Sequence, residues 1–178
     1  AWSNGSRLME GLRKSPVPVL LAKCELLPGP KTVLIPIDFS PASRDAATEA
    51  LALVRGFGGR AIFLHVLDMS YFYPAAYGVE PIIVPPVTPQ DIEPEWQEFL
   101  GTLPLTDIIW EKQTREGPAA RQIAEAVAEL SANLVVIGTH GRTGVAHMLL
   151  GSVAEAVLRL TDCSILTVRP DAFRFELP

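Results

Sequence analysis

Short apolar runs alternate with segments of helical periodicity along most of this chain, and that alternation constrains the fold more than any other feature. A run at 107–113 is predicted to be an exposed strand. The runs that are apolar enough to be buried strands are 31–38, 61–68, 133–138 and 164–169. A strand, a helix and a second buried strand form a βαβ unit, whose two strands are parallel. The sequence therefore predicts an α/β fold, a doubly wound open sheet with helices on both faces.

The helix after the first strand has signals at both ends. Ser40 is a preferred N-cap residue, and Pro41 suits the first helical position because its missing N–H would have no partner there. The helix is predicted to run to Arg55, and the glycines that follow, Gly56, Gly58 and Gly59, end it.

The rest of the chain holds three further helices and one irregular stretch. An amphipathic helix is predicted at 118–130 and a further helix at 153–160. A short helix within 89–103 is expected to be interrupted by Pro94. Residues 69–89 contain five prolines and no clear period. They fit a variable surface loop, and the alternative is a lid or a contact with a partner.

Length and composition limit the classes of function. The 178 residues suffice for one ordinary domain, and the net charge of −5 argues against a general nucleic-acid binder. Cys24 and Cys163 form no CxxC motif, which favours a reducing compartment. No run is long enough to span a bilayer and no signal peptide is evident. The sequence thus predicts a cytoplasmic protein that binds neither membrane nor nucleic acid.

The beginning of the chain repeats a later part of it. Residues 5–23 align without gaps on 151–169. Both segments begin with Gly-Ser and share a Leu-Arg pair. We interpret the first as the closing helix and strand of an upstream copy of the domain; an extension that resembles it by chance is the alternative. The expected organisation is an upstream remnant at 1–23, a linker at 24–30, the domain at 31–170 and a tail at 171–178.

The stretch GTHGRTGVAHMLLGS, residues 138–152, connects a strand to a helix with far more residues than the two to six that suffice. Glycines let phosphate oxygens approach the backbone, and a helix N-terminus attracts them. Ser152 begins the capping box Ser-Val-Ala-Glu, and it could instead donate its hydroxyl to phosphate. The stretch is not a P-loop, because it contains no lysine. Arg142 is its only fixed cation.

Ligands of doubly wound sheets bind beyond the carboxyl ends of the strands, where the strand order reverses. Asp38 ends the first strand and Gly138 ends the fourth. They form a natural pair if those strands are neighbours. The alternative is that Asp38 has a purely structural role, as a strand-end carboxylate that caps the next helix.

The spacing Gly138-x2-Gly141-x9-Gly151-Ser152 resembles the nucleotide-binding signature of the universal stress protein family. The segments VLIPIDFS, LHVLD and SILTVRP resemble that family's first, second and last strands. The resemblance covers 31–170 and implies an adenine nucleotide alpha hydrolase-like fold, with five parallel strands in the order 3-2-1-4-5. The spacing is the one found in ATP-binding members.

Site residues follow from this resemblance by position. Asp38 would contact the ribose or base of ATP, and the backbones of Pro36, Ile37 and Val66 would line the adenine pocket. Mg²⁺ would bind only through the phosphates, and no catalytic residue or protein-held metal is implied. Ribose and phosphates would be held by or lie next to Gly138, Thr139, His140, Gly141, Arg142, Gly151, Ser152 and Val153.

The function that the resemblance implies is an ATP-binding, nucleotide-dependent regulator of the stress response, with slow hydrolysis at most. The alternatives are an interaction or dimerisation module with a vestigial nucleotide site and, more weakly, a genuine hydrolase. Family dimers commonly pair their last strands. Here VPVLLA, residues 17–22, could pair with 164–169 and form a tandem pseudo-dimer, or the last strand could form a homodimer.

Other residues that could carry chemistry have simpler interpretations. His65 is expected in or near the core, and the loop residue His140 is expected to be solvated. Cys163 precedes a buried strand and is expected to serve packing. Trp96 and Trp110 are expected in the core or an interface rather than as stacking platforms.

Overall fold

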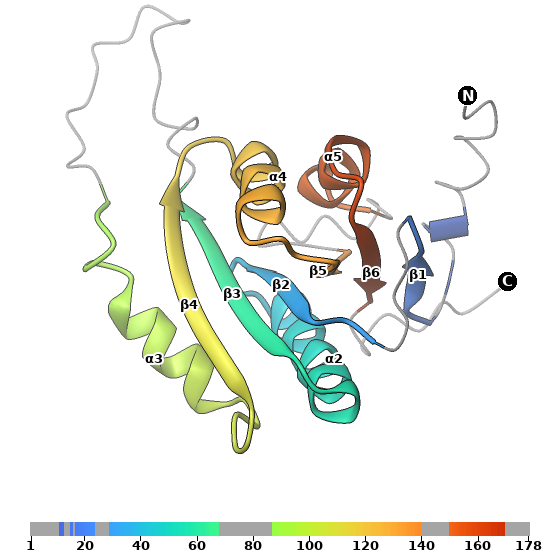
Figure 1. The fold of residues 1–178 in the computed structure, drawn as a ribbon. Helices are drawn as coiled ribbons and strands as arrows, with labels where there is room; N and C mark the ends of the chain where they lie inside the picture. Colours follow the sequence, from blue (N-terminus) through green and yellow to red (C-terminus); the bar gives the residue numbers. More distant parts are fainter. Residues whose placement is uncertain are drawn as a thin grey trace, which may run out of the picture.

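In the residues that the computed structural model describes, one sheet has six strands in the order β1-β6-β5-β2-β3-β4 (Figure 1). The structure describes residues 11–12, 15, 17–23, 29–67, 87–139 and 150–169. The strands are β1 (Val19–Leu21), β2 (Thr32–Ile37), β3 (Arg60–Leu67), β4 (Ile109–Glu116), β5 (Leu134–Gly138) and β6 (Ser164–Val168). Strands β2 to β6 are mutually parallel and follow the expected order, while β1 adds an antiparallel sixth strand beyond β6.

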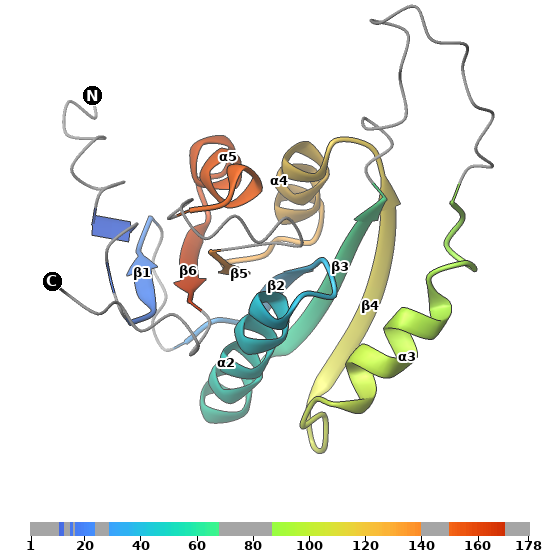
Figure 2. The same cartoon turned by 180° about the vertical axis from the view of Figure 1, so that it is seen from behind.

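Among the described residues, the four helices α2 to α5 cover the two faces of the sheet, which confirms the predicted doubly wound α/β fold (Figures 1 and 2). They are α2 (Pro41–Phe57), α3 (Glu93–Gly101), α4 (Ala119–Glu129) and α5 (Ser152–Leu160). Helices α2 and α3 lie on one face, and α4 and α5 lie on the other.

Two hydrophobic cores fill the space between the sheet and its helices. Side chains alternate along β2, so that Val33 and Ile35 point toward α2 and α3 while Leu34 points toward α4 and α5. Every residue of β2 is buried, as expected for a parallel strand covered on both faces. Burying a side chain of this size contributes about 1.5–3 kcal/mol, so these two cores are the main source of stability.

Helix α2 begins as predicted and ends later. The Oγ of Ser40 accepts a hydrogen bond from the backbone N–H of Ser43 at 3.2 Å, which confirms the N-cap. The helix continues to Phe57, so Gly56 lies within it. Gly58 ends the helix with φ of 72°, and its N–H donates to the carbonyl of Val54 at 2.9 Å.

Two further boundaries correct the prediction. Pro94 lies in the first turn of α3, where its missing N–H costs nothing, so it does not interrupt that helix. Strand β4 is exposed as expected, but it begins at Ile109 because Asp107 has φ of 60°, which breaks the extended conformation. Residues 68–86, most of the irregular stretch, lie outside the described residues.

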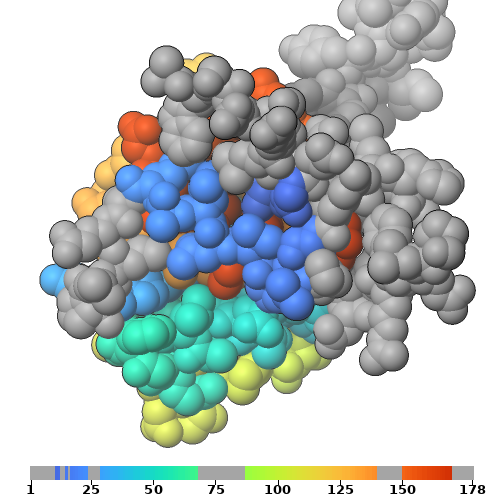
Figure 3. Space-filling view, turned by 90° about the vertical axis from the view of Figure 1, so that its right-hand side faces the viewer, coloured from blue at the N-terminus to red at the C-terminus, as the bar shows by residue number. Residues whose placement is uncertain are grey.

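The segment that precedes the domain joins the sheet. Strand β1 pairs with β6 in antiparallel register, with Val19 opposite Thr167, Leu20 opposite Leu166 and Leu21 opposite Ile165. This confirms the expected pairing of 17–22 with 164–169. Figure 3 shows β1, in dark blue, on the surface of the molecule.

Asn133 aligns the beginnings of the two central strands. Its Oδ1 accepts hydrogen bonds from the backbone N–H groups of Lys31 and Thr32, each at 3.1 Å. Its own N–H donates to the carbonyl of Thr32 at 3.1 Å. One side chain just before β5 therefore holds the start of β2.

We predict that Asn133→Ala lowers the free energy of unfolding by about 1–3 kcal/mol, because the buried N–H of Thr32 loses its acceptor. Asn133→Asp keeps an oxygen at the same position and should lose less. Denaturant titration of both variants measures the difference. Equal losses in the two variants would contradict the assigned role of the acceptor.

Candidate functional site

The strand order reverses between β2 and β5. From β2 the chain proceeds to β3 and β4 on one side of the sheet, then returns to β5 and β6 on the other. Strands β2 and β5 are hydrogen-bonded neighbours, with Val33 opposite Leu134 and Leu34 opposite Val135. Asp38 and Gly138 therefore lie at the ends of neighbouring strands, as their proposed pairing requires. Ligands of doubly wound sheets bind at the carboxyl ends of such a strand pair.

Asp38 follows the last residue of β2 and lies in this crevice position. Its Oδ1 accepts hydrogen bonds from the backbone N–H of Ser40 at 3.1 Å and from the Ser40 hydroxyl at 2.5 Å. Ser40 in turn caps α2. The half-buried carboxylate thus supports the helix cap, in agreement with the structural role considered for Asp38, and is held at the end of the strand.

Phe39 fixes the turn between Asp38 and Ser40, and the sequence analysis missed it. Its φ of 62° is unusual for a residue with a side chain. The Phe39 ring packs on His65 at a centroid distance of 4.5 Å and meets Trp96 edge-on at 5.2 Å. These contacts compensate for the strained backbone. Nothing local in the sequence distinguishes this phenylalanine from an ordinary core residue.

The neighbouring strand positions are buried at the same end of the sheet. His65 lies in the core as expected, with its Nδ1 at 2.7 Å from the carbonyl oxygen of Ile37. Pro36 and Ile37 are buried within β2, opposite Leu64 and His65. Val66 is half-buried one residue further along β3. The structure therefore brings Pro36, Ile37 and Val66 beside Asp38.

Gly138, at the end of β5, allows a close approach between that strand and α2. A Cβ at this position would lie 2.9 Å from the carbonyl oxygen of Ala42, closer than real Cβ atoms come. The structure thus gives Gly138 a packing role, in addition to any contact with a ligand.

The two ends of the glycine stretch meet directly. The backbone N–H of Gly151 donates to the carbonyl of Thr139 at 2.6 Å, and the N–H of Thr139 donates to the carbonyl of Val168 at 2.9 Å. A Cβ on Gly151 would lie 3.3 Å from the Thr139 oxygen. Gly138-Thr139 and Gly151-Ser152 are therefore brought together at one place. His140, Gly141 and Arg142 lie outside the described residues.

The predicted capping box at Ser152 is wrong. Gly151 is the N-cap of α5 and makes no side-chain cap bond, and Ser152 is the first helical residue. The amide of Gly151 is committed to Thr139, which places the helix start one residue earlier than the motif predicts. The Glu155 carboxylate pairs with Arg159 at 2.6 Å instead of reaching back to the cap. Ser152 and Val153 are exposed at the first turn.

Two tryptophans and a cysteine that could carry chemistry instead pack against neighbouring side chains or lie in the core. Trp96 is 1% exposed and its Nε1 donates to the Thr114 hydroxyl at 3.3 Å, so it belongs to the core as expected. Trp110 is 37% exposed on β4 and packs against Phe63. Cys163 is buried, in agreement with a packing role.

Within the described ranges, no group of three His, Cys, Asp or Glu residues is placed to hold a metal ion. In the same part of the chain no helix has the length and apolar character needed to cross a bilayer.

The fold and this crevice define a doubly wound α/β protein whose candidate ligand site lies at the topological switch point. The chain belongs to the universal stress protein family, whose family model matches residues 29–169.

Relatives in this family cover most of the chain. Universal stress protein MJ0531 of Methanocaldococcus jannaschii is 32% identical over 145 residues, which are 78% of this chain and 82% of the relative. Universal stress protein A homolog 1 of Coxiella burnetii is 34% identical over 141 residues, 78% of this chain and 95% of the relative. Universal stress protein E of Photorhabdus laumondii is 29% identical over 171 residues, 91% of this chain but 54% of the relative. The chain thus spans about half the length of that third protein.

Solved structures share the fold. The structure of hypothetical protein MJ0577 superposes with a TM-score of 0.65 at 22% identity, over 78% of this chain and 95% of that one. A universal stress protein in complex with cAMP superposes with a TM-score of 0.55 at 20% identity, over 79% of this chain and 98% of that one.

We predict that Phe39→Ala destabilises the protein more than Phe39→Gly does, by about 1 kcal/mol. Both variants lose the ring contacts, but only glycine adopts a positive φ without a Cβ clash. Chemical unfolding of the two variants and of the unchanged protein gives the comparison. Equal stability of Phe39→Ala and Phe39→Gly would contradict the left-handed backbone assigned to residue 39.

Proposed function

We propose that this protein binds an adenine nucleotide at the carboxyl ends of β2 and β5 and acts as a nucleotide-dependent regulator of the stress response. The observation that carries the proposal is the convergence of Asp38, Gly138-Thr139 and the start of α5 at the switch point. This is where doubly wound folds bind nucleotides. Adenine nucleotides of this kind are found inside cells, so the proposal places the protein in the cytoplasm.

The phosphates would lie at the N-terminus of α5. The first N–H groups of a helix have no partner within the helix, and the helix dipole favours negative charge at that end. Exposure of Ser152 and Val153 leaves their backbone open to a ligand. Ser152 is not the cap residue of α5, so its hydroxyl would be available to donate to a phosphate oxygen. Gly141 and Arg142 would approach the phosphates from the glycine stretch, and Mg²⁺ would bind through the phosphates alone.

The nucleoside would lie between β2 and β3. The Asp38 carboxylate would accept a hydrogen bond from a ribose hydroxyl or from the base, while the backbones of Pro36, Ile37 and Val66 would line the adenine pocket. The cAMP complex of a structural relative supports an adenine nucleotide as ligand class. We favour ATP over cAMP because the glycine spacing is that of ATP-binding members.

Hydrolysis would be slow at most. Phosphoryl transfer requires a group that positions water and a metal whose ligands are fixed. The sequence of the glycine stretch supplies neither, so we assign no catalytic residue. The proposed activity is nucleotide binding.

A second candidate function is an interaction module with a vestigial nucleotide site, and the β1–β6 pairing is the observation that favours it. In this view residues 1–23 derive from an upstream copy of the domain at 31–170, joined by a linker at 24–30. The edge of β6 would then serve a tandem pseudo-dimer, or a homodimer where that edge is open. Measurement of nucleotide binding separates the two functions, because a vestigial site would bind no nucleotide.

We predict that Asp38→Asn lowers the affinity for ATP by about 10- to 100-fold, because a hydrogen bond to a charged carboxylate is lost. Asparagine retains an oxygen that can accept from Ser40, so the cap of α2 should persist. Titration calorimetry with ATP, cAMP and GTP measures affinity and base preference.

Asp107→Asn is the matched control, because Asp107 lies in the turn before β4, far along the sheet from the crevice. It should leave the affinity unchanged. Absence of binding to the unchanged protein at millimolar ATP would refute the proposal, and equal affinity in Asp38→Asn would refute the assigned site. A phosphate-release assay with Mg²⁺ distinguishes a binder from a hydrolase.

A further inference from the structure

His65, on β3, contacts both residues that flank Asp38. Its Nδ1 lies 2.7 Å from the carbonyl oxygen of Ile37, and its ring packs on the ring of Phe39 at a centroid distance of 4.5 Å. Because a carbonyl oxygen only accepts a hydrogen bond, Nδ1 carries a proton and donates it. One side chain therefore holds the backbone just before Asp38 and the side chain just after it.

The position of the Asp38 carboxylate depends on the conformation of Phe39. The Oδ1 of Asp38 accepts hydrogen bonds from the backbone N–H and the hydroxyl of Ser40, two residues further on. Phe39 lies between them with φ of 62°, a conformation that a residue with a Cβ adopts at a cost. The contacts of the Phe39 ring therefore help to decide whether the carboxylate stays in place.

Helix α3 supports the two rings from behind. Trp96 and Phe99 meet the Phe39 ring edge-on, at centroid distances of 5.2 and 5.8 Å. Trp96 also meets the His65 ring edge-on at 6.3 Å. Edge-to-face contacts are a favourable geometry for aromatic rings. Trp96 is itself fixed, because its Nε1 donates to the Thr114 hydroxyl on β4 at 3.3 Å.

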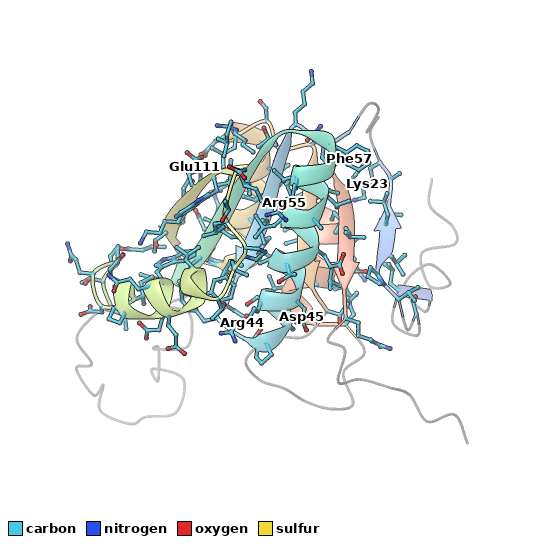
Figure 4. All side chains as sticks on the ribbon, turned by 90° about the horizontal axis from the view of Figure 1, so that it is seen from below. Lys23, Arg44, Asp45, Arg55, Phe57 and Glu111 are labelled. Carbon is cyan, nitrogen blue, oxygen red and sulfur yellow. The ribbon has the colours of Figure 1, made fainter. Side chains whose placement is uncertain are left out.

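Two cations from other elements lie over the rings of α3. Arg44, labelled on α2 in Figure 4, places its Cζ 5.8 Å from the centroid of the Phe99 ring. Lys112, on β4, places its Nζ 5.7 Å from the Trp96 ring and pairs with Glu93 of α3 at 2.6 Å. A cation over an aromatic ring is attracted to its negative face. Helix α2 and strand β4 thus both hold the rings that support Phe39.

We propose that His65 and Phe39 form a clasp that positions the Asp38 carboxylate for the nucleotide before the nucleotide binds. His65 is then a positioning residue, which acts on affinity through Asp38. The inference rests on the nucleotide site proposed above. A carboxylate that is already ordered saves the cost of ordering it on binding, so loss of the clasp weakens binding. His65 is 7% exposed, and its bond to the Ile37 carbonyl offsets the cost of burying the imidazole.

Hydrogen exchange of the Ser40 amide, followed by NMR without nucleotide, tests the clasp itself. This amide donates to Asp38, so its exchange relative to the amides of β2 reports how firmly the carboxylate is held. His65→Leu removes the donor and the aromatic ring, and it should raise this relative exchange by about ten-fold. His65→Asn keeps an N–H close to the position of Nδ1 and should recover part of the protection.

Phe63→Leu is the matched control. Phe63 is also buried on β3 and lies two residues before His65, but its ring packs on Trp110. The variant should leave the relative exchange of Ser40 unchanged. If His65→Leu does not fold, Phe39→Leu removes the ring contact from the other side of Asp38 and should raise the same exchange. Unchanged relative exchange in the folded variant would overturn the clasp.

Titration calorimetry with ATP tests whether the clasp acts through Asp38. His65→Leu should lower the affinity by about five- to ten-fold, and His65→Asn by less. Combined with Asp38→Asn, His65→Leu should cost less than about two-fold more, because the group through which it acts is already lost. Equal losses with and without Asp38→Asn would overturn the positioning role. Absence of ATP binding to the unchanged protein would refute the proposed function and with it the effect on affinity, while Ser40 exchange would still decide whether the clasp exists.

Discussion

Burial of β2 on both faces is the constraint on which the other elements depend. A strand whose every residue is buried needs a parallel neighbour on each edge and a helix layer above and below. Strands β3 and β5 supply the edges, and α2 and α5 lie in opposite layers. Because β2 is both the first strand of the parallel set and its centre, the reversal of strand order falls beside it. The same burial that stabilises the domain therefore places the switch point beside Asp38.

Helix α5 connects the switch point to the pairing of β1 with β6. Its N-terminus is fixed by the bond between Gly151 and Thr139, and its C-terminal carbonyls accept hydrogen bonds from Lys23, which follows β1. The nucleotide site proposed above would therefore lie at one end of a helix whose other end is held by the segment that pairs with β6.

Local sequence signals predicted the fold because they reflect burial directly. Apolar runs and helical periodicity located the parallel strands, and the Ser40-Pro41 pair located the start of α2. The repeat at the beginning of the chain predicted the pairing of β1 with β6, a contact between residues far apart in sequence.

Local sequence signals gave a wrong or incomplete prediction where a tertiary contact determines the local structure. Ser152 looks like an N-cap as convincing as Ser40, but the bond from Gly151 to Thr139 makes Gly151 the cap. Phe39 adopts a left-handed backbone because three rings of distant origin surround it, and no neighbour in sequence reveals that. The assignment of Gly138 to phosphate approach stays a prediction, and the close approach of Ala42 is a second reason for this glycine that the sequence did not reveal. The identity of the ligand stays a proposal that rests on glycine spacing and place in the fold.

The most direct test of nucleotide binding at the switch point is an amide-resolved NMR titration of the protein with ATP and Mg²⁺. The account predicts that the largest shifts occur at Thr139, Gly151, Ser152 and Val153, with the outer strand β4 unaffected. Shifts confined to β4, or a spectrum unchanged at millimolar ATP, would contradict it.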